Sequence, residues 1–210
     1  MENDEKAIEY RTDPLDIAEA KNAIGVVYIN LADNSSDPKE KANNYKKAHE
    51  FYKEALTLRE ENNAEAKAIA YSYHNIGSYF NKIGDYSEAV KYHKKALEIR
   101  EKNDIDKADI AASFAWLGND YIALDDMDNA KDYIDKSLAL RESLYGKAHP
   151  DYAWGLSSLV DWYYTKGMIE EAKNTNEEVI KIRKTFLGEN HDYTKRAIQR
   201  QRKMVAEPTR

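Results

Sequence analysis

The chain of 210 residues contains no cysteine. Without a thiol it cannot use cysteine as a nucleophile, build a disulfide framework or hold zinc through sulfur ligands. It also lacks the run of about eighteen apolar residues that a membrane-spanning helix needs. Its acidic start, MENDEKAIEYRTDP, has no apolar signal-peptide segment. The lack of a membrane span and of a signal peptide predicts a cytoplasmic protein, whereas the lack of cysteine is compatible with other compartments as well.

An excess of basic residues is missing as well. Asp and Glu (38) outnumber Lys and Arg (32), which gives a formal net charge of -6. This balance argues against a globally basic nucleic-acid-binding protein. Phenylalanine (4) is scarce beside tyrosine (16), and a third of the residues are charged. Such a composition is typical of a helical protein with large, half-exposed contacts.

The usual motifs of catalytic and cofactor sites are absent. There is no G-x-S-x-G, no phosphate-cradling glycine loop and no dinucleotide-binding fingerprint, and none of the five histidines forms an HExxH pair. We therefore expect no enzymatic activity, no cofactor and no metal site.

What the chain does contain is a repeat. Four similar segments recur: YKEALTLRE, HKKALEIRE, IDKSLALRE and NEEVIKIRK. Their arginines lie 41, 41 and 42 residues apart, at Arg59, Arg100, Arg141 and Arg183. Upstream, one aligned column holds Gly25, Gly77, Gly118 and Val160. A second column holds Ala48, Ala89, Ala130 and Ala172. Agreement across four copies predicts four copies of one structural unit.

Each copy is predicted to be a pair of helices. Apolar side chains recur with helical spacing from Ile69 to Phe80, Gly84-Asp85 interrupts the pattern, and a second apolar stripe follows at 86–99. Small residues in the glycine and alanine columns would let the two helices approach closely, because a bulky side chain there would overpack the contact.

These residues resemble the tetratricopeptide repeat family. The marks of the resemblance are Ile76-Gly77, Phe80, Gly84-Asp85-Tyr86, Ala89 and Ala96 in the second copy and Leu117-Gly118, Tyr121 and Ala130 in the third. The resemblance covers approximately residues 15–187. The long period and the ALEIRE-type helix endings are similar to the repeats of kinesin light chains, although the heptad coiled coil that precedes those repeats is absent. The resemblance implies an all-α, right-handed α-solenoid of four helix-turn-helix repeats plus a closing helix.

The expected organisation follows the repeat. An acidic segment at 1–14 precedes repeats at 15–62, 63–103, 104–147 and 148–188, and a capping helix with a basic tail occupies 189–210. The first repeat carries an inserted loop at 32–44, within which Asp37 is predicted to cap a helix that begins at Pro38. In the fourth repeat Asn176 occupies a column that elsewhere holds Tyr52, His93 and Ile134.

The tripeptide His149-Pro150-Asp151 has two interpretations. The same letters mark the loop through which J-domain co-chaperones address their partner, but the helix before that loop is strongly basic, whereas residues 131–148 are of mixed charge. His149 follows Arg141 by eight residues, as His191 follows Arg183. We therefore interpret the tripeptide as a joint between two helices.

The resemblance implies a concave groove that is lined by the first helix of each pair and binds a peptide or protein segment. Helical geometry predicts that its lining is Asn22, Tyr71, His74, Asn75, Ser78, Trp116, Asn119, Trp154, Ser157, Asp161 and Tyr164. Asn and Ser can bind a peptide backbone, and Tyr and Trp supply contact area. For Trp116 and Trp154, lining the groove and packing between repeats remain equal alternatives.

Two functions are compatible with this prediction. The first is a non-catalytic scaffold for a protein or peptide ligand. The second is a regulatory or sensory module whose superhelix changes shape on binding a signalling peptide, as in peptide receptors of quorum-sensing bacteria, although residues 1–14 are too few for the output domain of those receptors. A carboxylate clamp for a chaperone tail is disfavoured because Ala112 and Trp116 occupy two of its positions.

The closing helix is basic, through Lys195, Arg196, Arg200, Arg202 and Lys203. This charge is interpreted as a solvated capping face. The alternatives are a surface for an anionic partner or self-association between the basic and acidic ends of neighbouring molecules.

Overall fold

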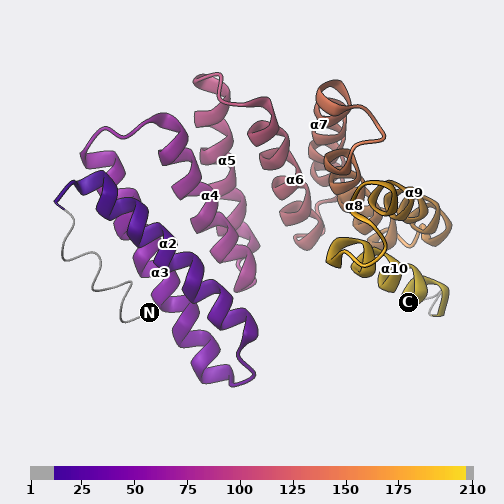
Figure 1. Cartoon of the computed structure of the whole chain (residues 1–210), viewed down its shortest axis with the longest axis horizontal. Coiled ribbons are helices and arrows are strands. Elements are labelled where there is room, and N and C mark those ends of the chain that lie inside the picture. Colours follow the sequence, from indigo (N-terminus) through magenta and orange to yellow (C-terminus); the bar gives the residue numbers. More distant parts are fainter. Residues whose placement is uncertain (1–11, 207–210) are drawn as a thin grey trace. The chain divides into compact units, whose positions relative to one another are not determined.

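The computed structural model describes residues 12–206, which form nine α-helices and no strand (Figure 1). The first four are α2 (Pro14–Asn34), α3 (Pro38–Glu61), α4 (Ala66–Lys82) and α5 (Tyr86–Lys102). The next four are α6 (Lys107–Ala123), α7 (Met127–Tyr145), α8 (Pro150–Thr165) and α9 (Ile169–Leu187), and α10 (Asp192–Ala206) closes the series. The predicted all-α fold is confirmed, and the helix pairs form an α-solenoid.

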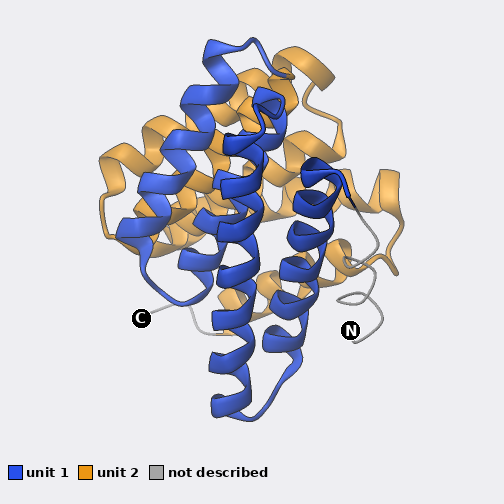
Figure 2. Ribbon diagram, turned by 90° about the vertical axis from the view of Figure 1, so that its left-hand side faces the viewer, with its two compact units in different colours: residues 1–105 blue, residues 106–210 orange. Residues whose placement is uncertain are grey.

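The chain divides into two compact units, Met1–Ile105 and Asp106–Arg210 (Figure 2). The first contains the pairs α2/α3 and α4/α5, and the second contains α6/α7, α8/α9 and α10. Most of the predicted acidic segment 1–14 lies outside the described residues, as do the last four residues of the basic tail. None of the described helices combines the length and the apolar character that crossing a bilayer requires.

The insertion in the first repeat extends helices rather than forming a long loop. The predicted loop at 32–44 is wrong, because only residues 35–37 lie outside α2 and α3. The Asp37 carboxylate accepts a hydrogen bond from the Lys39 backbone N–H at 3.0 Å, and Pro38 is the first residue of α3. The predicted cap is therefore confirmed, and it starts the helix early enough to absorb most of the insertion.

The glycine column lies where the two helices of a pair meet. A Cβ atom added to any of the first three glycines would lie 2.5 to 2.7 Å from a side chain of the second helix. The facing pairs are Gly25 with Tyr52, Gly77 with His93 and Gly118 with Ile134. The side chains of the alanine column have no exposed surface. The two columns therefore provide the space that the large facing side chains fill.

The repeated arginine joins one helix pair to the next element of its unit. The Nη1 atoms of Arg59, Arg141 and Arg183 each donate a hydrogen bond of 3.1 Å to a backbone carbonyl near the start of the following helix. The accepting carbonyls belong to Ala68 in α4, Asp151 in α8 and Tyr193 in α10. All three arginines are buried. The sequence revealed this column but not its role.

The joint interpretation of His149-Pro150-Asp151 is confirmed. Gly146 ends α7 with a φ of 77°, a left-handed conformation that glycine adopts without strain. Pro150 begins α8, and the Nδ1 atom of His149 accepts a hydrogen bond from the Asp151 backbone N–H at 3.2 Å. His191 makes the same contact with the Tyr193 N–H at the start of α10. The two joints are thus built alike.

Candidate functional site

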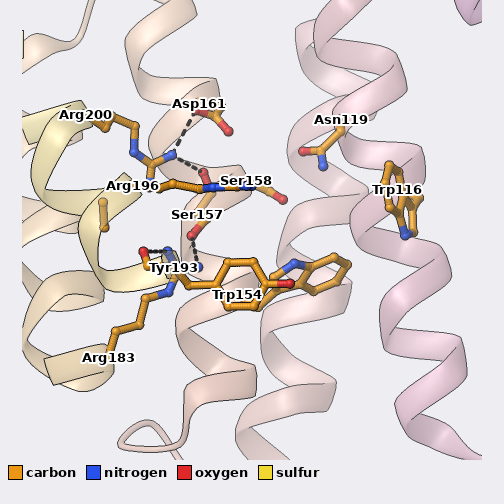
Figure 3. A pocket seen from close by; sticks show the side chains of 11 residues that line it. Trp116, Asn119, Trp154, Ser157, Ser158, Asp161, Arg183, Tyr193, Arg196 and Arg200 are labelled. Carbon is orange, nitrogen blue, oxygen red and sulfur yellow. Dashed lines mark hydrogen bonds and ion pairs between the residues drawn. The ribbon is translucent and has the colours of Figure 1, made fainter. Parts of the chain in front are cut away.

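Five of the predicted groove residues surround one hollow of about 330 Å³ in the second unit (Figure 3). Trp116 and Asn119 come from α6, and Trp154, Ser157 and Asp161 come from α8. Residues three, four or seven positions apart share one face of a helix, which explains why each helix presents its set together.

The two tryptophans are half-buried and both line this hollow. Their rings meet edge to face with centroids 6.4 Å apart. Trp154 also packs against α7, because the guanidinium of Arg141 in that helix lies 4.4 Å from the centroid of the Trp154 ring. The alternatives for these side chains therefore do not exclude one another: each contacts a neighbour and leaves an aromatic surface toward the hollow.

The opposite wall of the hollow is formed by residues that the sequence did not predict as a binding surface. Its residues come from α9 and α10 and are Arg183, Tyr193, Arg196, Ala197 and Arg200. The four from α10 follow an i, i+3, i+4, i+7 spacing, which is one face of a helix. That spacing is visible in the sequence, but a basic helix at the end of an array is by itself typical of a solvated cap.

Arg183 holds α9 against both neighbouring helices. Besides its contact with α10, it donates from Nη2 to the Ser157 hydroxyl in α8 at 2.9 Å. Burial and then the nearby charge of Arg200 lower the pKa of Arg183 to about 10. The side chain therefore remains a cation at neutral pH and contributes positive charge to the hollow.

Arg200 reaches from α10 across to α8. Its Nη1 atom donates to the Asp161 carboxylate at 3.0 Å and to the Ser157 backbone carbonyl at 3.3 Å. Although 54% of the Asp161 side chain is exposed, the surrounding protein withdraws enough water to raise its pKa, an effect that Arg200 opposes. Burial and the ion pair act in opposite directions on this carboxylate.

The unusual Asn176 holds α10 in place. This fully buried side chain donates to the Ala197 carbonyl at 3.0 Å and to the Gln201 side chain at 2.7 Å. Its Oδ1 atom accepts from Arg200 Nε at 2.9 Å. A polar residue in an otherwise bulky column thus links α9 to the closing helix and orients an arginine of the hollow.

Asn119 supplies an acceptor that the protein itself leaves unused. Its Oδ1 atom is buried and has no hydrogen-bond partner among the residues that the structure describes. The amide lies at the edge of the hollow (Figure 3). A buried acceptor without a partner is costly, so a ligand N–H group that completed it would gain more than an ordinary surface hydrogen bond.

The groove residues predicted in the first unit are arranged differently. Asn22 and Asn75 are buried and hydrogen-bonded to each other at 2.7 Å, so part of their amide capacity is used within the protein. Ser78 is half-buried, and Tyr71 is 44% exposed. In the second unit Tyr164 is exposed and does not line the hollow. Pairing between amides on separate helices leaves no signal in the spacing of either helix.

His74 packs against other imidazole and phenol rings. Its ring centroid lies 5.2 Å from that of His93 and 6.5 Å from that of Tyr71. Burial, and then the nearby His93 and Arg100, lower the pKa of His74 to about 3. The imidazole is therefore neutral in the folded protein under all mildly acidic conditions.

Acid should destabilise the protein through this histidine. Because the unfolded chain takes up a proton near pH 6.5 and the folded chain does not, stability is complete above pH 6.5 and falls as the pH decreases toward 3. We expect a loss of about 2 kcal/mol in the free energy of unfolding between pH 7 and pH 5, measured by urea denaturation. The variant His74→Asn should lose this contribution and keep that of His49, whose pKa burial also lowers, and an unchanged slope would exclude His74 as a source.

The described residues contain no group of three or more His, Asp or Glu side chains that could hold a metal ion.

A family model described as tetratricopeptide repeat matches residues 39–102 and 109–185. No curated protein is similar in sequence.

Several solved structures share the fold. A putative kinesin light chain from Podosopora anserina, with nearly identical TPR-like repeats, is 16% identical with a TM-score of 0.68, over 94% of this chain and 89% of that chain. BtubC (BKLC) from P. vanneervenii is 16% identical with a TM-score of 0.63, over 93% and 92%. A Rap protein complexed with Competence and Sporulation Factor is 16% identical with a TM-score of 0.70, over 97% of this chain and 58% of that chain.

The family model covers well over half of the residues, and its matched segments contain Gly77, Gly118 and the four repeated arginines, whereas α2 with Gly25 precedes them. The chain therefore belongs to the tetratricopeptide repeat family.

Proposed function

We propose that this protein is a non-catalytic interaction scaffold that binds an extended peptide or protein segment in the hollow of its second unit. The observation that carries the proposal is the convergence of Trp116, Asn119, Trp154, Ser157 and Asp161 on one concave surface. Aromatic side chains there supply contact area at low entropic cost, and amide and hydroxyl groups can bind a peptide backbone.

The hollow has the mixed character of a recognition site. The two indole rings form an apolar wall, and the unpaired Asn119 carbonyl offers a hydrogen-bond acceptor beside it. Sites that bind ligands combine an apolar surface with a few placed polar groups in this way. The first unit is left out of the proposed site because Asn22 and Asn75 are buried against each other.

Peptide binding can be tested on the full chain with a displayed library of randomised dodecapeptides. Selected peptides should produce a saturable change in tryptophan fluorescence. The double variant Trp154→Ala/Asn119→Ala should weaken their binding about tenfold or more in calorimetry, as is usual when a central aromatic contact is lost.

The matched control is Tyr164→Ala, which removes an exposed aromatic ring from the same helix outside the hollow. Its affinity should equal that of the wild type. Equal affinity in the double variant as well would show that the peptides bind elsewhere, and a failure to select any peptide would refute the proposal.

A regulatory role, in which the repeats change their arrangement on binding a signalling peptide, is the second candidate. It is favoured by the likeness to the Rap protein that was crystallised with Competence and Sporulation Factor. Small-angle X-ray scattering with and without a selected peptide separates the two roles, because only the regulatory role requires a change in the radius of gyration.

A further inference from the structure

The charge of the hollow differs in sign from that of the whole chain. Three guanidinium groups, those of Arg183, Arg196 and Arg200, share the lining with a single carboxylate, that of Asp161. The formal net charge of the chain is -6. All three arginines come from α9 and α10, opposite the wall that bears the tryptophans. The hollow is therefore a local cationic site on an acidic protein.

Two of these arginines are already bound within the protein. Arg183 contacts α8 and α10 through both terminal nitrogens, and Arg200 contacts α8 and α9. Arg196 differs from them. In the part of the chain from 12 to 206 it makes no hydrogen bond or ion pair, and its exposed side chain points into the hollow (Figure 3). Arg196 is thus the guanidinium that is left for a ligand.

The backbone beneath Arg196 is held firmly. The adjacent Ala197 is 2% exposed, and its carbonyl accepts the hydrogen bond from Asn176. Arg200, one helical turn further on, is tied to α8 and α9. A ligand would therefore order only the side chain of Arg196 and not the helix that carries it, which lowers the entropic cost of binding.

The ion pair between Arg200 and Asp161 indicates which anion fits. Arg200 on this wall already binds a carboxylate, because its Nη1 atom lies 3.0 Å from Oδ1 of Asp161. The Asp161 side chain stays 54% exposed. An arginine binds a carboxylate through two parallel hydrogen bonds, which gives geometric selectivity. A ligand carboxylate beside Asp161 could use both terminal nitrogens of Arg196, and it would compete with Asp161 for Arg200.

We propose that α10 forms one wall of the ligand site and that the hollow selects a peptide segment bearing an acidic side chain, which Arg196 binds. This rests on the proposed peptide-binding function and adds the chemistry of the ligand to it. The basic face of α10, first interpreted as a solvated cap, then has a binding role at Arg196 in addition to closing the array.

The test uses peptides selected on the full chain from the randomised dodecapeptide library. They are synthesised with amidated C-termini, so that only side chains carry carboxylates, and each is paired with a version in which Asn or Gln replaces Asp or Glu. Selected sequences should be enriched in Asp and Glu, and the acidic version should bind about tenfold more tightly than its neutral partner, as expected for a charged bidentate contact.

Three single variants separate the roles of the charges in and near the hollow. Arg196→Gln should abolish the preference for the acidic version. Arg202→Gln makes the same change on the same helix at an exposed residue outside the hollow, and should keep the preference. Asp161→Asn should tighten the binding of the acidic version, because Arg200 then loses its internal carboxylate.

The outcomes also distinguish this inference from the function on which it rests. Suppose that the acidic and neutral peptides bind equally well and that both bind the double variant Trp154→Ala/Asn119→Ala more weakly. This result would overturn the inference and leave the scaffold function intact. A preference that survives in Arg196→Gln, or that requires a free C-terminal carboxylate, would also overturn it. Displacement of the peptide by dilute inorganic phosphate would indicate a general anion site instead.

Discussion

Replacing Gly118 with leucine is expected to lower the free energy of unfolding by about 2 to 3 kcal/mol. A Cβ atom at this position would lie 2.7 Å from Cγ1 of Ile134 and 3.4 Å from the backbone oxygen of Ala130. Ile134 and Ala130 have no exposed surface, so α6 and α7 must move apart to admit the new side chain. The strain also has to exceed the gain of roughly 1 kcal/mol in helix propensity when glycine is replaced.

Urea denaturation at neutral pH measures this effect. The control is Ala139→Leu, which adds bulk to the exposed face of α7 and should leave stability within about 0.5 kcal/mol of the wild type. Gly118→Ala should give an intermediate loss. If the leucine variant were as stable as the control, the glycine column would not be the point of closest approach between these helices.

The sequence predicted this column because its signal repeats. Close packing of two helices excludes large side chains at fixed positions, and the requirement recurs in each pair, so Gly25, Gly77 and Gly118 align. Asn176 is the exception that the repeat could not explain. Its role depends on contacts with α10, whereas Tyr52, His93 and Ile134 in the same column face the glycines of their own pairs, so a comparison among copies contains no information about such a contact.

The candidate site was predictable on one wall only. Helical geometry groups Trp154, Ser157 and Asp161 on one face of α8, and the same rule applies to Trp116 and Asn119 on α6. The opposite wall depends on how α10 packs against α9, and that packing is set by tertiary contacts such as the one from Arg183 to the Tyr193 carbonyl. The basic residues of α10 could be identified in the sequence, but the direction in which their side chains point could not.

The role of the arginine column also could not be predicted from the sequence. Four arginines at a fixed spacing are plain in the sequence, yet a charged residue on a helix is usually solvated. Burial of Arg59, Arg141 and Arg183 becomes intelligible only when the carbonyl that each one reaches is known, since a buried charge requires hydrogen-bonded partners.

Replacing Arg141 with methionine is therefore expected to cost about 2 to 3 kcal/mol in the free energy of unfolding. Arg141 is 4% exposed, and its guanidinium donates to the Asp151 carbonyl at 3.1 Å and to the Ser137 hydroxyl at 3.3 Å. It also lies 4.4 Å from the centroid of the Trp154 ring. Methionine fills a similar volume but donates no hydrogen bond, so both of these contacts are lost. Methionine also carries no charge, so the variant avoids the desolvation cost of burying the guanidinium, which offsets part of the loss.

The position of the loss identifies its cause. Backbone amides of α8 should exchange hydrogen faster in Arg141→Met than in the wild type, because the arginine ties the start of that helix to α7. The control Lys147→Met removes a charge from an exposed side chain between the same helices and should change neither stability nor exchange. Arg141→Lys should recover only part of the stability, since one ammonium group cannot reproduce the planar fork that reaches both helices. Uniform acceleration of exchange along the chain would instead mean that the arginine supports the whole fold and not this joint.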